Sequence, residues 1–189
     1  MKNILHKKRI PFLAIILSVL LIVGCKNEKK EVVTLYIYAS KDTLLVEENV
    51  YKQVPYVIST LQVNKNKTIL EKMTVIADTL SKGYFNNLEI EVSSFDQLPE
   101  EDFVKINLKE QSQYDGPGSL PSYQSWYDYF QGSYGGKNTT IILRESFLQR
   151  DYESKWVDGL VFYYQGKPME PMDHLFLRGL IRRDMRDPV

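Results

Sequence analysis

Apolar residues alternate with polar ones, or cluster with β-branched and aromatic neighbours, in segments that predict strands. The first begins at Val32 and reads Val-Val-Thr-Leu-Tyr-Ile-Tyr, a composition typical of a strand. The polar pair Lys41-Asp42 predicts a turn after it, and residues 44–57 predict a second, less regular extended segment that Pro55 interrupts. The domain is therefore expected to begin at residue 32 with two extended segments.

A helix is predicted over residues 69–81, where apolar residues recur at every third or fourth position: Ile69, Met73, Ile76 and Leu80. Thr68, followed three residues later by Glu71, fits a capping box at the start of this helix. Gly83 is expected to end it. The spacing also predicts that the apolar stripe is buried against a sheet.

Strict alternation returns at residues 88–92, where Glu89 and Glu91 share the expected solvent face of a half-buried strand. A partner strand is indicated by alternating Val104, Ile106 and Leu108. Thr139–Arg150 is predicted to be a second helix, and Leu160–Tyr164 a last strand. This order predicts an α+β fold with a single mixed β-sheet and two helices packed on one face. The charged tail from Arg182 onward is expected to be frayed.

Glycine and aromatic residues are mixed in the stretch between residues 111 and 136, before the second helix. Linkers rarely carry so many large rings, so an ordered loop anchored by aromatic side chains is predicted. Four of them are candidate partner-binding residues: Trp126, Tyr123, Tyr127 and Tyr129. Trp126 is expected to be the exposed anchor, because tryptophan is enriched among interface hot spots. Two alternatives stay open: the loop binds a glycan or solute, or its rings only pin it onto the sheet.

The N-terminus has the three-part pattern of a secretory signal peptide. Four basic residues precede an apolar run from Phe12 to Val23, which is too short for a permanent membrane span. The run ends Leu21-Ile22-Val23-Gly24-Cys25, which resembles the lipobox of bacterial lipoproteins. That resemblance implies cleavage before Cys25 and attachment of a lipid to it. Residues 1–24 are then the signal peptide, residues 25–31 a tether, and the protein is held on the extracytoplasmic side of a bacterial membrane.

Charge and composition narrow the function of the remaining chain. Removing the four basic residues of the signal peptide from the total of 24 leaves 20 against 24 acidic ones, a net charge of −4. An acidic chain is a poor partner for nucleic acid, which requires a basic surface. Cys25 is the only cysteine and His174 the only histidine after the signal peptide, so no metal site and no cofactor are expected. No combination of acid, base and nucleophile is evident, which argues against a hydrolase and against enzymatic activity.

The order of predicted elements resembles the GerMN domain, a module of sporulation and spore-germination proteins. The family opens with a Val-x-Leu-Tyr-Phe strand, to which Val33-Thr-Leu-Tyr-Ile-Tyr is similar, and Val104-Lys-Ile-Asn-Leu-Lys-Glu110 resembles its middle strand pair. Gly132-Ser-Tyr-Gly135 and Ser146-Phe-Leu-Gln149 resemble the segments around its second helix. Tyr164-Gln-Gly166 stands where the family has Val-Asp-Gly. Residues 173–182 echo its closing phrase.

The resemblance covers residues 32–182, which leaves residues 183–189 as a charged tail. Two features depart from the family: Leu80-Ser-Lys-Gly83 lacks the proline that often follows the first helix, and the loop at residues 111–129 is longer. The resemblance implies a fold similar to ring-building domains of secretion systems. It also implies a non-catalytic module that binds a protein partner in the cell envelope.

Overall fold

The computed structural model describes residues 31–47, 49–98 and 100–185. The expected signal peptide, Cys25 and most of the expected tether lie outside the described residues. Those expectations therefore stay predictions.

The described chain is an α+β domain, as predicted, with a mixed five-stranded sheet and a separate two-stranded hairpin. In chain order the elements are β1 (Val32–Leu45), β2 (Val50–Asn64), α2 (Ile69–Tyr84), β3 (Glu89–Ser94), β4 (Phe103–Lys109), α3 (Trp126–Phe130), α4 (Ser133–Leu148), β5 (Gly159–Tyr164), β6 (Lys167–Pro168) and β7 (Leu180–Arg182). The sheet order is β3-β4-β5-β6, and β7 also pairs with β5. β4 and β5 are parallel and the other pairs antiparallel, so the sheet is mixed.

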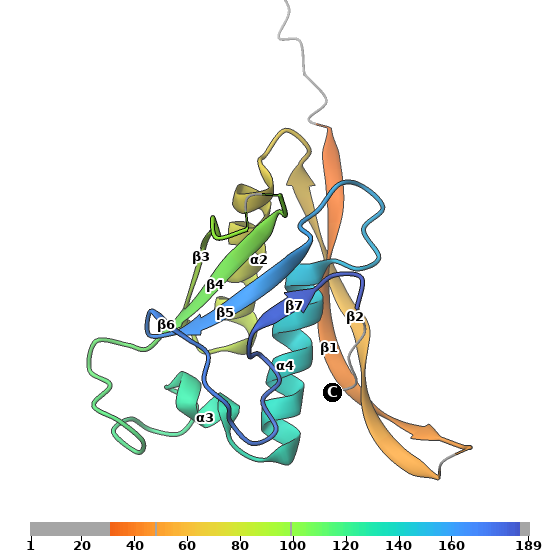
Figure 1. Ribbon diagram of the computed structural model, residues 1–189. Helices are drawn as coiled ribbons and strands as arrows, with labels where there is room; N and C mark the ends of the chain where they lie inside the picture. The colour runs from red at the N-terminus through yellow and green to blue at the C-terminus, as the bar shows by residue number, and fades with distance from the viewer. Residues whose placement is uncertain (1–30, 48, 99, 186–189) are drawn as a thin grey trace, which may run out of the picture. The chain divides into compact units, whose positions relative to one another are not determined.

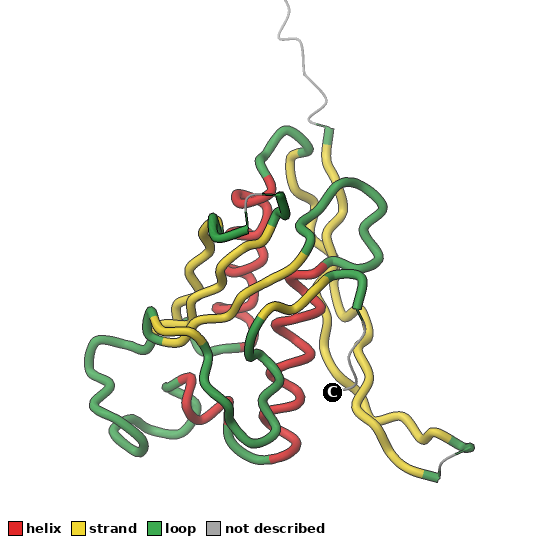
Figure 2. Tube along the Cα trace, viewed as in Figure 1, coloured by secondary structure: helices red, strands yellow, loops and turns green. Residues whose placement is uncertain are grey.

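The two long helices, α2 and α4, lie on one face of the five-stranded sheet, and the β1–β2 hairpin runs alongside α4 (Figures 1 and 2). Side chains from all three parts share one hydrophobic core, including Leu35 of β1, Ile76 of α2 and Phe162 of β5, each fully buried. Burial of these apolar surfaces is the main driving force for folding. The packing of two helices on one face is confirmed.

The hairpin does not join the main sheet, so the expectation of a single sheet is wrong. The reason is that side chains of α4 and its C-cap occupy the edge of β1 that a further strand would otherwise use. Gln149 bonds both the N–H and the C=O of Tyr36, and the Ser146 hydroxyl accepts from the Tyr38 N–H at 3.0 Å. The edge of β1 is thus satisfied by a helix.

The local predictions for the hairpin and for α2 were partly correct. Lys41 and Asp42 lie within β1 and Pro55 within β2, so the predicted turn at Lys41-Asp42 is wrong; turn geometry is found instead at Val46, Glu47 and Asn49. In α2 the capping box of Thr68 and Glu71 is confirmed. The helix runs through Gly83 to Tyr84, so Gly83 does not end it.

Helix α4 begins at Ser133, six residues before the predicted start, and takes in the glycine pair of the loop. A side chain at Gly136 would place its Cβ 2.8 Å from the carbonyl oxygen of His174, so glycine allows the C-terminal segment to cross the helix closely. The helix ends at Gln149, which has left-handed backbone geometry (φ 46°). Gly136 thus serves the close packing of α4 against the C-terminal segment.

Candidate interaction surface

Trp126 is fully buried, so the expectation that it is the exposed anchor of the aromatic loop is wrong. Its ring lies 4.7 Å from that of Phe85 and 6.1 Å from that of Phe130, measured between centroids. Its indole N–H donates to the Glu89 carbonyl at 3.3 Å. Burying so large a ring in the core stabilises the fold more than leaving it exposed for a partner would. Trp126 therefore anchors the loop inward, onto the end of α2 and the start of β3.

Glu110 holds the same loop from the other side. Its carboxylate accepts the backbone N–H groups of Trp126 at 3.0 Å and Tyr127 at 3.1 Å, and the Tyr164 hydroxyl at 2.7 Å. Burial and this carboxylate raise the pKa of Tyr164, so its hydroxyl stays protonated and remains a donor. A buried carboxylate with three donors is well satisfied. The start of α3 is thereby fixed.

Tyr123 is the most exposed of the four candidate partner-binding residues, with 56% of its surface accessible. Its backbone is held in the left-handed region (φ 61°), with its N–H donating to Asp128 at 2.9 Å and its C=O accepting from Asn86 at 2.8 Å. Tyr127 and Tyr129 are half-buried, and burial raises the pKa of Tyr129. The Tyr123 and Tyr129 rings lie 5.3 Å apart. The loop therefore presents one exposed ring on a rigid base.

A cavity of about 410 Å³ lies beside this loop and brings Tyr127 and Phe130 together with His174 and Met172. His174 is exposed and has a positive φ of 66°. Sequence reasoning had no signal that could place the C-terminal segment against α3. The cavity offers aromatic and polar groups to a small ligand.

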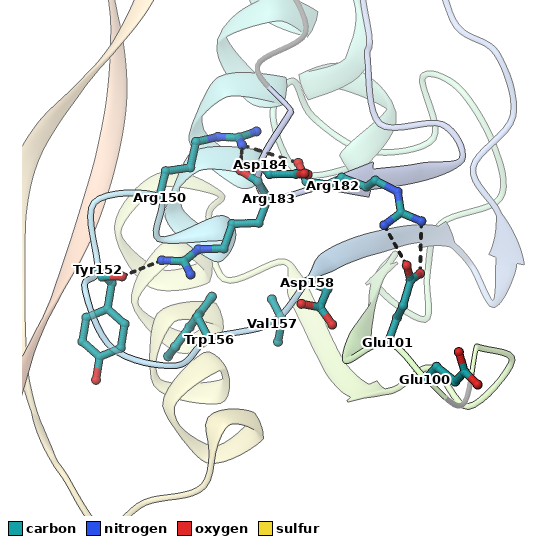
Figure 3. A pocket seen from close by; sticks show the side chains of 10 residues that line it. All are labelled: Glu100, Glu101, Arg150, Tyr152, Trp156, Val157, Asp158, Arg182, Arg183 and Asp184. Carbon is teal, nitrogen blue, oxygen red and sulfur yellow. Dashed lines mark hydrogen bonds and ion pairs between the residues drawn. The ribbon is translucent and has the colours of Figure 1, made fainter.

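A cavity of about 730 Å³ lies at the C-terminal end of α4 beside β7 and is lined mostly by charged residues (Figure 3). Arg182 makes a two-pronged ion pair with Glu101, at 2.9 and 3.1 Å. Arg183 donates to the carbonyl oxygens of Leu148, Gln149 and Tyr152 at 2.6–3.0 Å, which satisfies the free end of α4. Arg182 and Arg183 are therefore ordered, and the predicted fraying is wrong for them. This cavity is mainly a structural junction.

A second group of exposed apolar residues lies at the far end of the β1–β2 hairpin, and sequence reasoning missed it. We define the hairpin tip as residues 44–47 and 49–51. Its exposed apolar members are Leu44, Val46, Val50 and Tyr51, of which Val46 is 82% and Tyr51 72% accessible. In the sequence, the apolar residues on both sides of Glu47 have the pattern of a half-buried strand. The structure shows that they are exposed, because the helices do not cover this end of the hairpin.

Comparison with protein-family models, curated proteins and solved structures found no match to this chain. Within residues 31–47, 49–98 and 100–185 no helix has the length and apolar character needed to cross a membrane. In that same part of the chain, no cluster of three or more His, Cys, Asp or Glu residues is placed to hold a metal ion.

Proposed function

We propose that the chain is a lipoprotein of the bacterial envelope whose α+β domain, of the GerMN kind, is a non-catalytic module that binds a protein partner. The observation that carries the proposal is Tyr123, an exposed ring held on a rigid base. Tyrosine is enriched among interface hot spots, and an anchor already fixed in place loses little entropy on binding. The aromatic loop therefore has the properties of a binding surface.

The lipid tether is supported by the sequence around Cys25. The chain begins with a basic segment, continues with an apolar run and reaches Cys25 directly after Gly24. Five residues, 26–30, separate that cysteine from Glu31, the first residue that the structure describes. A domain so close to its anchor works at the membrane surface.

The GerMN part of the proposal is supported by where the similar segments lie. Val33 to Tyr38 falls in β1, Val104 to Lys109 in β4, and Ser146 to Gln149 at the end of α4. The resemblance points to an assembly of sporulation or germination proteins.

The partner surface can be tested by placing a photo-crosslinking amino acid at Gln124, next to Tyr123, in the full chain in cells. We expect a discrete protein adduct, which mass spectrometry identifies. Tyr123→Ala should abolish the adduct without unfolding the domain. Tyr134→Ala is the matched control, because Tyr134 is 59% exposed but belongs to α4. Persistence of the adduct in Tyr123→Ala would contradict the proposal.

The cavity beside Tyr127 favours a second candidate function, binding of a glycan or another small envelope solute. Aromatic rings that line a cavity with polar neighbours are typical of such sites. Calorimetric titration with soluble cell-wall fragments tests this candidate. Binding that Tyr127→Ala abolishes would favour it, and absence of heat from any fragment would count against it.

A further inference from the structure

The hairpin tip is apolar on both of its faces. Residues paired across an antiparallel hairpin share a face, and successive pairs alternate between faces. Leu44 pairs with Tyr51, and the next pair, Leu45 with Val50, lies on the opposite face. Val46 follows at the turn. An apolar residue therefore points to either side of the hairpin at its end.

The rest of the described chain leaves this apolar end uncovered. The side-chain hydrogen bonds between β1 and the α4 region extend from Tyr36 to Ser40, whose hydroxyl contacts Asn138 at 2.6 Å. Beyond that point the hairpin leads away from the helices (Figure 1). Contiguous exposed apolar residues on a soluble domain mark interaction sites.

The hairpin tip lies at the opposite end of β1 from the tether. A strand of 14 residues is about 45 Å long at about 3.3 Å per residue. Glu31, the last tether residue, precedes one end of this strand, and the apolar pairs lie at the other. The hairpin therefore holds its apolar end at the opposite end of β1 from Glu31, the first described residue.

Charge at the end of the hairpin discriminates between possible occupants. Glu47 is exposed at the turn, and Glu48 follows it in the sequence. Insertion of the tip into a bilayer would bury the Glu47 carboxylate, where an ionised group is very unfavourable. A protein slot can instead place lysine or arginine opposite Glu47, so that the charges are paired.

A second copy of this chain is a poorer match to that chemistry. The chain has a mainly apolar cavity of about 340 Å³ near Ile69 that could receive the tip of a second copy. Lys155 is the one cationic residue that lines it, and Lys155 is already paired with Asp102 at 2.9 Å. The arginines of the 730 Å³ cavity are bound to Glu101, Glu145 and the end of α4. The complementary slot is therefore expected on a different protein.

We propose that the hairpin tip inserts into an apolar slot of an envelope protein, and that lysine or arginine at the floor of this slot pairs with Glu47. This assignment rests on the proposed function, because it names a second surface of the same interaction module. The two apolar faces require contacts on both sides of the hairpin, which a slot provides and a flat surface does not.

The test replaces Val46 with a photo-crosslinking phenylalanine derivative in the full chain in cells. We expect one protein adduct that is not a second copy, with the crosslink in a peptide that contains lysine or arginine beside apolar residues. Glu47→Lys should reduce this adduct at least tenfold. The matched control is Glu153→Lys, which changes the charge equally at another exposed position and should leave the adduct unchanged.

An adduct with a second copy, an adduct with lipid, no adduct, or an adduct insensitive to the charge reversal would each overturn the inference. A parallel crosslinker at Gln124 separates this failure from that of the proposed function. If Gln124 yields a partner and Val46 does not, the hairpin inference alone fails. If neither position yields a partner, the proposed function fails with it. Protease resistance equal to that of the wild type confirms that each variant is folded.

Discussion

Gln149 joins the end of α4 to the hairpin, and its removal tests how firmly the hairpin is held. The side chain is fully buried. Its carbonyl oxygen accepts the Tyr36 N–H at 2.8 Å, and its amide nitrogen donates to the Tyr36 and Ser146 carbonyls, each at 2.6 Å. Gln149→Ala removes all three bonds and leaves both backbone groups of Tyr36 without a partner.

A buried polar group without a partner costs about 1–3 kcal/mol. Because Tyr36 is half-buried, water partly replaces the lost bonds, and two such groups predict a loss of about 2–4 kcal/mol in the free energy of unfolding. Gln149→Gly is the matched control, since glycine adopts the φ of 46° freely but also lacks the amide. We expect it to lose a similar amount.

Urea unfolding of both variants measures the loss, and hydrogen exchange at the Tyr36 amide locates it. The exchange should accelerate at Tyr36 more than at Ile106 in the centre of the sheet. A loss below about 1 kcal/mol in Gln149→Ala would refute the reasoning. Wild-type stability in Gln149→Gly would also refute it, because the loss in Gln149→Ala would then come from backbone strain at this position and not from the missing side-chain amide.

Three further predictions concern the core and α2. Trp126→Ala should destabilise the domain by about 3–5 kcal/mol in urea unfolding, as loss of a buried ring does; wild-type stability would contradict the anchor role. Ile76→Ala should lower the free energy of unfolding by about 2–5 kcal/mol, and an unchanged melting temperature would contradict the burial of the apolar face of α2. Hydrogen bonds from the Thr68 backbone and side chain hold the pKa of Glu71 below its ordinary value of 4.5. The stabilisation is therefore present above pH 4.5 and lost as pH falls through the lowered pKa. As the pH falls through that range, the free energy of unfolding should drop less in Glu71→Gln than in the wild type. If urea unfolding shows the same drop in both proteins, the Glu71 carboxylate does not have the capping role.

Local signals in the sequence predicted much of the fold. The capping box at Thr68 and the alternation around Ile90 and Ile106 depend only on neighbouring residues, and the helix and strands they predict are present. The separate hairpin depends on a contact between Tyr36 and Gln149, 113 residues apart, for which no sequence pattern exists. Strand β7 has only three residues, too few for a periodic pattern.

The candidate surface was harder to predict, because the sequence does not show which side of an aromatic loop faces inward. Trp126 was expected outside, but Phe85 and Phe130 provide a buried site for it. Tyr123 is exposed because bonds to Asn86 and Asp128 hold its backbone in a left-handed turn. At the hairpin tip, apolar alternation normally indicates a core. The structure shows that these residues are exposed, because β1 extends beyond Ser40, the last of its residues with a hydrogen bond to α4.

The claim that the domain is held at a membrane through Cys25 is tested most directly by mass spectrometry of its N-terminal peptide, prepared from the membrane fraction of cells. The account predicts a peptide that begins at Cys25 and carries a diacylglyceryl group on that cysteine. It also predicts that Cys25→Ala leaves the membrane fraction. A peptide that begins before Gly24, or an unmodified Cys25 in protein that remains with the membrane, would contradict it.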